Sequence, residues 1–260
     1  MTTPDPQNLF AVRFFFFKVD GLIVMLSYLL GSIPFGYLVA KSRGIDIRRQ
    51  GSGNIGATNV MRVLGKGPGY TVFACDALKG LVAVVAAGYL ATHHSLPITQ
   101  IHNSHVGANL VIERGTYFYR LPESIAAITA AICCMIGHCF PVWLGFKGGK
   151  GMATAAGVLI GMMPLTAAGC LALWAVVFLA TRYVSLASIA AAVALPVFTM
   201  LRLVTGSLEG WPYFYFATAA CILAVWRHRA NIVRLMNGTE SRFVRKPKTE
   251  PPADQPSENK

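Results

Sequence analysis

A glycine-rich polar segment at residues 51–62, with the sequence GSGNIGATNVMR, has the composition of an anion-binding loop. Its glycines allow the backbone to turn so that successive N–H groups point toward one anion. Between and after them stand hydrogen-bonding side chains and one guanidinium suited to phosphate: Ser52, Asn54, Thr58, Asn59 and Arg62. No acidic residue occurs between positions 51 and 69, which favours an anion site over an ordinary flexible loop.

Two lysines among glycines mark a second segment, residues 137–154. Its centre is the run Lys147, Gly148, Gly149, Lys150 and Gly151. The run lies between two apolar stretches, where a glycine turn entering a helix N-terminus offers an anion both backbone donors and the helix dipole. It is not a nucleotide-binding Walker A loop, because Gly rather than Ser or Thr follows Lys150. A basic turn at the membrane interface is the alternative, and it explains the lysines but not the three glycines.

A third segment, residues 227–240, places a histidine close to an amide and several arginines. His228 and Asn231 are three positions apart, hence neighbours on one helix face, and Arg234 follows one turn later. Histidine is the side chain best suited to moving a proton near neutral pH. A basic helix end at the membrane surface is the alternative, so the prediction of a site depends on all three segments sharing one side of the membrane.

Missing patterns disfavour several classes of protein. Neither His138 nor His228 is followed at the fifth position by Asp, the arrangement of acyltransferases that use soluble donors. The apolar stretches hold almost no carboxylates except Asp76, so an ion-coupled transporter lacks its usual relay. The chain has no Asp-rich cluster for Mg²⁺, and the four histidines between positions 93 and 105 have no acid or Cys at ligand spacing. We therefore predict no metal and no cofactor.

Taken by themselves, the three segments predict a metal-free site that holds phosphate anions beside lipid. An electrophile that is already activated, such as an acyl phosphate, would suit this site. Its anhydride bond needs positioning and charge stabilisation more than it needs a metal.

The composition of the 260 residues is that of a membrane protein: 54% are hydrophobic and only 13% charged, against about 25% charged in a soluble domain. We predict an all-α polytopic membrane protein of about seven transmembrane helices, with the three polar segments as loops. Five helices are expected at residues 21–40, 69–91, 124–144, 183–204 and 211–226. The apolar stretch 152–181 is too long for one span, and Met163-Pro164 divides it into two short helices.

The distribution of Lys and Arg predicts the orientation of these helices. With the N-terminus outside, 18 of the 23 Lys and Arg residues, and all three polar segments, fall on one side, which is therefore cytoplasmic. We expect one membrane domain over residues 1–242, including an N-terminal extension at 1–19 and an outer loop at 93–122. Residues 243–260 are polar and proline-rich, and we expect a disordered cytoplasmic tail.

Three stretches of the chain resemble the three cytoplasmic motifs of the bacterial acyl-phosphate-dependent glycerol-3-phosphate acyltransferases, the PlsY family. They are GSGNIGATNVMR, GHCFPVWLGFKGGKGMAT and RHRANIVRLMNGTE, in the order that the family shows. The neighbouring stretches GSIPFGYLVAK and TRYVSLASI also fit the family's helices, so that the resemblance covers about residues 21–240. The N-terminal extension, the outer loop and the tail depart from the compact family pattern.

This resemblance implies an enzyme of the bacterial inner membrane that transfers a fatty acyl group from acyl phosphate to the 1-hydroxyl of sn-glycerol 3-phosphate. The products are lysophosphatidic acid and phosphate, in the first acylation of phospholipid synthesis. It implies no nucleic-acid partner, and we infer no obligate protein partner. The family's functionally important residues correspond to Ser52, Arg62, His228 and Asn231. Gly148, Gly149 and Gly151 would contribute to acyl-phosphate binding, and Glu240 would be structural.

Our mechanistic hypothesis divides the polar residues between two substrates. Lys147 or Lys150, with the glycine amides, would hold the acyl phosphate, whose chain lies in a groove between helices. Ser52, Asn54, Thr58 and Arg62 would hold the glycerol phosphate. His228, oriented by Asn231, would either take the hydroxyl proton or place a donor phosphate oxygen to take it. The further predicted substrate-binding residues are Gly53, Asn59, Thr154 and Ser185. The rivals are a transporter of a phosphorylated metabolite and an acyltransferase with a thioester donor.

Overall fold

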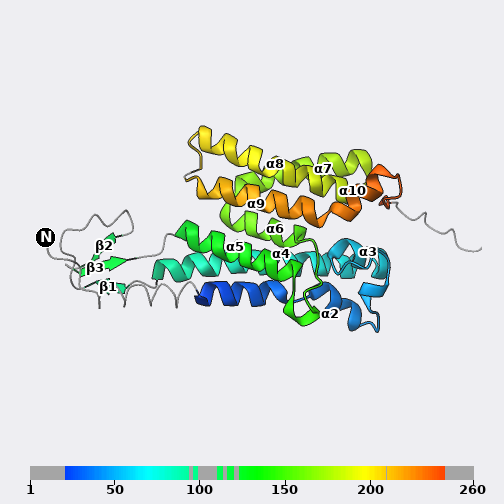
Figure 1. Cartoon of the computed structure of the whole chain (residues 1–260), viewed down its shortest axis with the longest axis horizontal. Helices are drawn as coiled ribbons and strands as arrows, with labels where there is room; N and C mark the ends of the chain where they lie inside the picture. The colour runs from blue at the N-terminus through cyan, green and yellow to red at the C-terminus, as the bar shows by residue number, and fades with distance from the viewer. Residues whose placement is uncertain are drawn as a thin grey trace, which may run out of the picture.

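The computed structural model describes residues 21–93, 96–98, 110–113, 116–119, 123–208 and 210–243. The predicted N-terminal extension and nearly all of the predicted tail lie outside these residues. Figure 1 shows an elongated bundle of helices, with α3 (Ala57–Leu64) and α10 (Arg229–Met236) at one end and three short strands at the other.

The seven predicted transmembrane segments are all helical in the described chain. Residues 21–32 form a helix that is broken at Ile33-Pro34 and continues as α2 (Phe35–Lys41). The others are α4 (Lys66–His93), α5 (Glu123–Cys139), α6 (Met152–Met162), α7 (Pro164–Thr181), α8 (Val184–Val204) and α9 (Pro212–Arg227). The short 3-10 helix η1 (Ile47–Arg49) precedes the first glycine segment, and η2 (Val142–Leu144) lies within the second, before its lysines.

The prediction of a helical multi-pass membrane protein is confirmed. Five helices of the described chain are long and apolar enough to cross a bilayer: Gly21–Lys41, Lys66–His93, Glu123–Leu144, Pro164–Thr181 and Val184–Val204. The predicted division at Met163-Pro164 is also present, because Pro164 is the first residue of α7. The two helices around it are unequal: α6 has 11 residues and rises roughly 16 Å, about half a hydrocarbon layer.

The prediction of a purely helical chain missed a small sheet in the connection between α4 and α5. Strands β1 (Leu96–Ile98), β2 (Leu110–Glu113) and β3 (Thr116–Tyr119) pair antiparallel in the order β1-β3-β2. Strands of three and four residues are too short to show a clear alternation of polar and apolar positions. Of the four histidines in this region, His93 ends α4, and the other three lie outside the described residues.

Helices α4 and α6 approach so closely that only glycine fits between them. A Cβ added to Gly157 would lie 1.8 Å from the Ala77 carbonyl oxygen, and one added to Gly80 would lie 2.3 Å from the Thr154 carbonyl oxygen. Helix α4 also packs on α3 and α5, whereas α7, α8 and α9 pack on one another in sequence, and α6 joins the two groups (Figure 1). The two groups of helices therefore share α6, which begins at the second glycine segment.

The break in the first helix is compensated by a side chain from α4. Pro34 has no N–H, so the helix cannot continue its hydrogen bonds through it. The Ile33 carbonyl oxygen instead accepts hydrogen bonds from Phe35 N at 3.1 Å and from Lys79 Nζ at 2.9 Å. Since a backbone carbonyl without a partner is costly in a bilayer, Lys79 stabilises the break.

Candidate functional site

His228 occupies the junction of two helices, where it ends α9 and precedes α10. Its Nδ1 lies 2.8 Å from the Ala224 carbonyl oxygen. Because a carbonyl can only accept, Nδ1 carries the hydrogen, which leaves Nε2 of the neutral ring as an acceptor. Burial, followed by the nearby charge of Lys150, lowers the pKa of His228 to about 4, so the ring is neutral near pH 7.

The ring of His228 is not oriented by Asn231, in contrast to our expectation from their spacing. Its hydrogen bond goes to Ala224, one turn earlier in α9, because the chain bends between the two helices at His228 itself. The Asn231 side chain points to other partners: its Nδ2 donates to Glu240 Oε1 at 2.7 Å, and its Oδ1 accepts from Lys150 Nζ.

Glu240 is a buried carboxylate that joins two helices, α8 and α10. Its Oε1 accepts from Ser185 Oγ of α8 and from Asn231 Nδ2 of α10, both at 2.7 Å, and its Oε2 accepts from Arg234 Nε at 2.7 Å. Burial would raise the pKa of this carboxyl, but the hydrogen bonds from these three side chains and the charge of Arg234 outweigh it and leave the pKa lowered. This geometry agrees with the structural role that the resemblance implied, and it places Ser185 in the same supporting network.

Lys150 lies where the second and third segments meet. Burial lowers its pKa to about 8; the charge of Glu240 opposes this, and the charges of Arg234, Arg62 and Arg227 add to the lowering. Four cations from all three polar segments therefore act on one another here, with a single carboxylate among them. Such a cluster has an excess of positive charge and attracts anions.

The amides of Gly148 and Gly149 are already paired. Gly148 N donates to the Cys139 carbonyl oxygen at 3.2 Å, and Gly149 N donates to that of His138 at 3.1 Å. Their own carbonyl oxygens accept from the guanidinium of Arg227, at 3.0 Å for Gly148 and at 2.6 Å for Gly149. The structure therefore uses these glycines to seat the loop on α5 and α9, and it does not leave their amides to an anion as we had expected.

The free backbone donors of this segment belong to the start of α6. Gly151 precedes the helix with φ of +79°, a conformation that favours glycine and that turns the chain into α6. The first N–H groups of a helix have no partner within it, and here they begin directly after Lys150. Thr154, a predicted substrate ligand, is fully buried in the packing of α6 against Gly80 of α4.

Asn59 organises the first segment from inside. Its Oδ1 accepts from Ser52 N at 2.9 Å, and its Nδ2 donates to the carbonyl oxygens of Gln50 at 3.0 Å and Asn54 at 2.9 Å. The Asn54 side chain closes the next turn by accepting from Gly56 N at 2.8 Å. Asn59 is 2% exposed, so it belongs to the framework of the loop, whereas the Ser52 side of the loop faces outward.

Arg62 connects the first segment to the third. It lies exposed in the last turn of α3, and its Nη2 donates to the Ser241 carbonyl oxygen at 3.2 Å, directly after Glu240. Figure 1 shows α3 and α10 at the same end of the bundle. The structure thus brings together predicted residues from all three segments and Ser185 of α8. Those from the segments are Arg62, Gly148, Gly149, Lys150, His228, Asn231 and Glu240.

Other predicted residues lie at this end without such contacts. Lys147 is exposed on the second loop, and Thr58 is half-buried in the first turn of α3. Gly53 has φ of +70° and lies in the loop that Asn59 braces. The described residues contain no group of three His, Cys, Asp or Glu that could hold a metal ion. Sequence reasoning missed Arg227, whose signal was its position beside His228 in a run of three basic residues.

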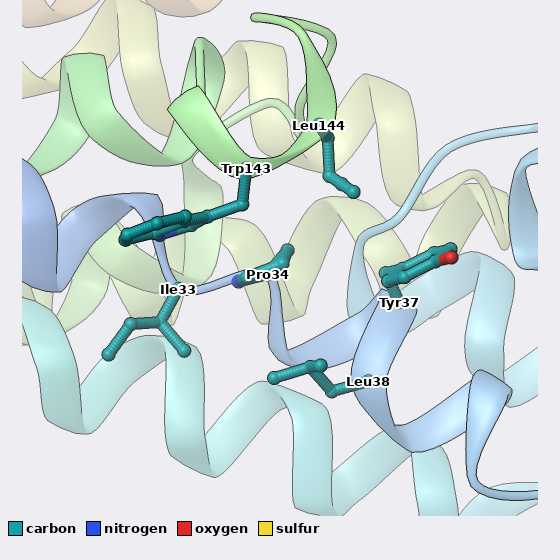
Figure 2. Close-up of a pocket in the computed structure, with 6 residues that line it drawn as sticks. All are labelled: Ile33, Pro34, Tyr37, Leu38, Trp143 and Leu144. Atoms are coloured by element: carbon teal, nitrogen blue, oxygen red, sulfur yellow. The ribbon is translucent and has the colours of Figure 1, made fainter.

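An apolar pocket of about 300 Å³ lies beside the second segment, between the break in the first helix and η2. Figure 2 shows Trp143 and Leu144 on one side and Ile33, Pro34, Tyr37 and Leu38 on the other. None of the predicted polar site residues lines it, so the pocket is separate from the cation cluster.

The chain is similar to several known proteins. A family described as glycerol-3-phosphate acyltransferase matches residues 21–238. A glycerol-3-phosphate acyltransferase of Thermosynechococcus vestitus is 40% identical over 224 residues, which are 86% of this chain and 94% of that protein. The protein of the same name from Halalkalibacterium halodurans is 41% identical over 237 residues, 89% of this chain and 99% of that protein.

Two solved structures of PlsY, an integral membrane glycerol 3-phosphate acyltransferase, are also similar to this chain. Its glycerol 3-phosphate form superposes with a TM-score of 0.69 at 36% identity, covering 86% of this chain and 96% of that one. Its lysophosphatidic acid form gives a TM-score of 0.67 at 36% identity, covering 86% and 95%.

Replacing Glu240 with Gln should destabilise the protein by about 1.5–3 kcal/mol, the scale of a hydrogen bond to a charged group. Because the folded-state pKa of Glu240 is lowered, its contribution is present above the ordinary Glu pKa of roughly 4.3 and is lost as the pH falls through the folded-state value. Melting temperatures in detergent should therefore differ most between wild type and Glu240→Gln at pH 5–7 and converge only as the pH falls below the lowered folded-state pKa of Glu240. Glu123→Gln, at an exposed position, is the control, and a pH-independent difference for Glu240→Gln would contradict the prediction.

Proposed function

Because the chain belongs to the PlsY family of glycerol-3-phosphate acyltransferases, we propose that it transfers a fatty acyl group from acyl phosphate to the 1-hydroxyl of sn-glycerol 3-phosphate. The products are 1-acyl-glycerol 3-phosphate, which is lysophosphatidic acid, and inorganic phosphate. The observation that carries this proposal is the cluster of Arg62, Arg227 and Arg234 around Lys150, with the neutral ring of His228 beside Lys150 and Arg227. Both reactants carry a phosphate, and a site with several cations and one carboxylate can attract two anions at once.

The acyl phosphate is assigned to the second segment. The Lys150 ammonium and the first N–H groups of α6 form one set of donors for its phosphate, since helix dipole and cation act on the same point. Arg227 would contribute charge while it holds the glycine turn. Lys147, which is exposed on the same loop, would attract the donor from the membrane surface. Gly148 and Gly149 support this set without donating to the phosphate.

Glycerol 3-phosphate is assigned to the first segment. The Arg62 guanidinium, the exposed Ser52 hydroxyl and the first turn of α3 with Thr58 are the donors available for its phosphate. Gly53, Asn54 and Asn59 shape the loop that carries Ser52. Asn231, held by Glu240 and in contact with Lys150, lies where the two sets of donors meet.

The reaction itself needs one bond to form and one to break. The 1-hydroxyl oxygen attacks the carbonyl carbon of the acyl phosphate, the bond from that carbon to the phosphate oxygen breaks, and the acyl group becomes an ester. His228 Nε2 accepts the hydrogen bond of the hydroxyl and so orients it. With a pKa of about 4, His228 is a weak base near pH 7, which favours transfer of the proton to the departing phosphate over transfer to the ring.

We place the three segments on the cytoplasmic side of the bacterial inner membrane, with the N-terminus outside, on the basis of the Lys and Arg distribution. The donor and the product are lipids, and residues 1–242 would form one membrane domain in which both remain. The apolar helices beside the cluster would hold the acyl chain.

The donor assay tests the proposal. Purified protein in detergent should convert labelled glycerol 3-phosphate to lysophosphatidic acid with palmitoyl phosphate and fail with palmitoyl-CoA. Product from palmitoyl-CoA alone would assign a thioester donor. The rival transporter predicts no product from either donor, together with uptake of labelled glycerol 3-phosphate into sealed vesicles that contain the protein.

Arg62→Ala should lower kcat/KM for glycerol 3-phosphate on the order of ten- to a hundredfold. The reason is the loss of a charge-assisted hydrogen bond, worth about 1.5–3 kcal/mol. Steady-state kinetics with palmitoyl phosphate would measure it, with Lys66→Ala as a matched control at an exposed cation a few positions later. Near-normal kinetics in Arg62→Ala would remove Arg62 from the glycerol-phosphate site.

Lys150→Arg should change the pH dependence of kcat/KM more than its value at neutral pH. Since the Lys150 pKa is lowered to about 8, the free enzyme loses this cation above that pH, and wild-type kcat/KM should fall by up to about tenfold per pH unit there. Arg stays protonated throughout this range, so the alkaline fall should disappear in the variant. The same fall in both proteins would show that another group causes it.

A further inference from the structure

Three ionisable side chains outside the cation cluster meet in the interior of the bundle. Asp76 and Lys79 lie three positions apart on α4, and His138 lies near the end of α5. Lys79 Nζ is 2.7 Å from Asp76 Oδ1, 3.0 Å from His138 Nδ1 and 2.9 Å from the Ile33 carbonyl oxygen. None of the three side chains is more than 5% exposed.

The buried ion pair fixes one edge of the His138 ring. His138 Nδ1 lies 3.0 Å from Lys79 Nζ and 3.4 Å from Asp76 Oδ1, so it is in contact with both members of the pair. The third polar contact of Lys79 is the Ile33 carbonyl oxygen. The ring is therefore held on its Nδ1 side by the ion pair.

The other edge of the His138 ring supports the second segment. A Cβ added to Gly149 would lie 2.1 Å from His138 Nε2, so the ring is in contact with the Gly149 backbone, while Gly149 N donates to the His138 carbonyl oxygen. On its carbonyl side, the same glycine accepts from Arg227. The turn is thus held between His138 and Arg227, and the next residue along the chain is Lys150.

We propose that Asp76, Lys79 and His138 are positioning residues, which hold the Gly148–Gly149 turn and thereby fix the Lys150 ammonium and the start of α6 for acyl transfer. Burying ions in a bilayer protein is costly, and well-packed apolar residues often stabilise a core equally well. A role in positioning explains why three polar side chains stand where apolar ones would pack. This inference rests on the proposed function, because its consequence is measured in the acyl-transfer reaction.

Two His138 variants separate the two edges of the ring. The amide oxygen of Asn can take the place of Nδ1 and accept from Lys79, whereas the amide of Gln reaches toward the place of Nε2 and leaves Lys79 with a donor unused. We expect His138→Asn to keep kcat/KM for palmitoyl phosphate within about fivefold of wild type. We expect His138→Gln to lower it on the order of thirtyfold or more. This figure is the loss of a buried hydrogen bond, converted at a factor of ten per roughly 1.4 kcal/mol.

The Michaelis constant and the pH profile distinguish positioning from a general loss of folded protein. Loss of folded enzyme lowers the apparent kcat alone, leaving the KM for palmitoyl phosphate and the alkaline fall of kcat/KM unchanged. Displacement of Lys150 should raise the KM for palmitoyl phosphate about tenfold in His138→Gln. It should also shift the pH above which kcat/KM falls, because the surroundings of Lys150 change. His138→Asn should restore the wild-type KM for palmitoyl phosphate and the wild-type pH dependence of kcat/KM.

A double variant keeps the test decisive if His138→Gln does not fold. Asp76→Asn with Lys79→Met removes both charges together and leaves no unpaired ion in the interior. The double variant should melt cooperatively in detergent. Its KM for palmitoyl phosphate should nevertheless be raised, and the pH above which its kcat/KM falls should be shifted. Wild-type KM and pH profile in His138→Gln and in the double variant would overturn the inference, as would failure of both to fold. If wild-type protein is inactive with palmitoyl phosphate, the proposed function fails instead.

Discussion

The Glu240 carboxylate holds together a group of cations that would otherwise repel one another. Arg62, Lys150, Arg227 and Arg234 act on the same small region, and among the described residues Glu240 is the acid that moderates their charges there. It does so through Arg234 directly and through Asn231, which contacts Lys150. This carboxylate stabilises the cluster and still leaves the excess positive charge that anionic reactants require.

The bilayer imposes a second constraint, since every buried polar group must find its partner within the protein. The break at Pro34 leaves the Ile33 carbonyl needing a donor, and Lys79 supplies it while pairing with Asp76 and His138. The same chain of contacts reaches the glycine turn before Lys150. A requirement of membrane folding and a requirement of the site are thus met by one cluster.

Much of the fold could be predicted from the sequence because long apolar runs and a Met-Pro pair are local signals. The helical segments and the division before α7 follow from them. The close approach of α4 and α6 at Gly80 and Gly157 was not predicted. The short strands could not be predicted either, since segments of three or four residues gain their stability from pairing and not from a local pattern. The three polar segments could be picked out from their composition, but the contacts inside them, such as that of His228 with Ala224, could not.

The sequence by itself determined which donors and cations the protein has, and that they fall in three segments between apolar helices. Only the tertiary structure decided which of them are free. The amides of Gly148 and Gly149 pair with α5, Asn59 closes its own loop, and His228 bonds to Ala224 in place of Asn231. Lys150 meets Asn231 across 81 positions of the chain, and Arg227 meets Gly149 across 78. A hydrogen-bonding group is satisfied by whatever folding brings beside it, and partners so far apart in sequence leave no local pattern.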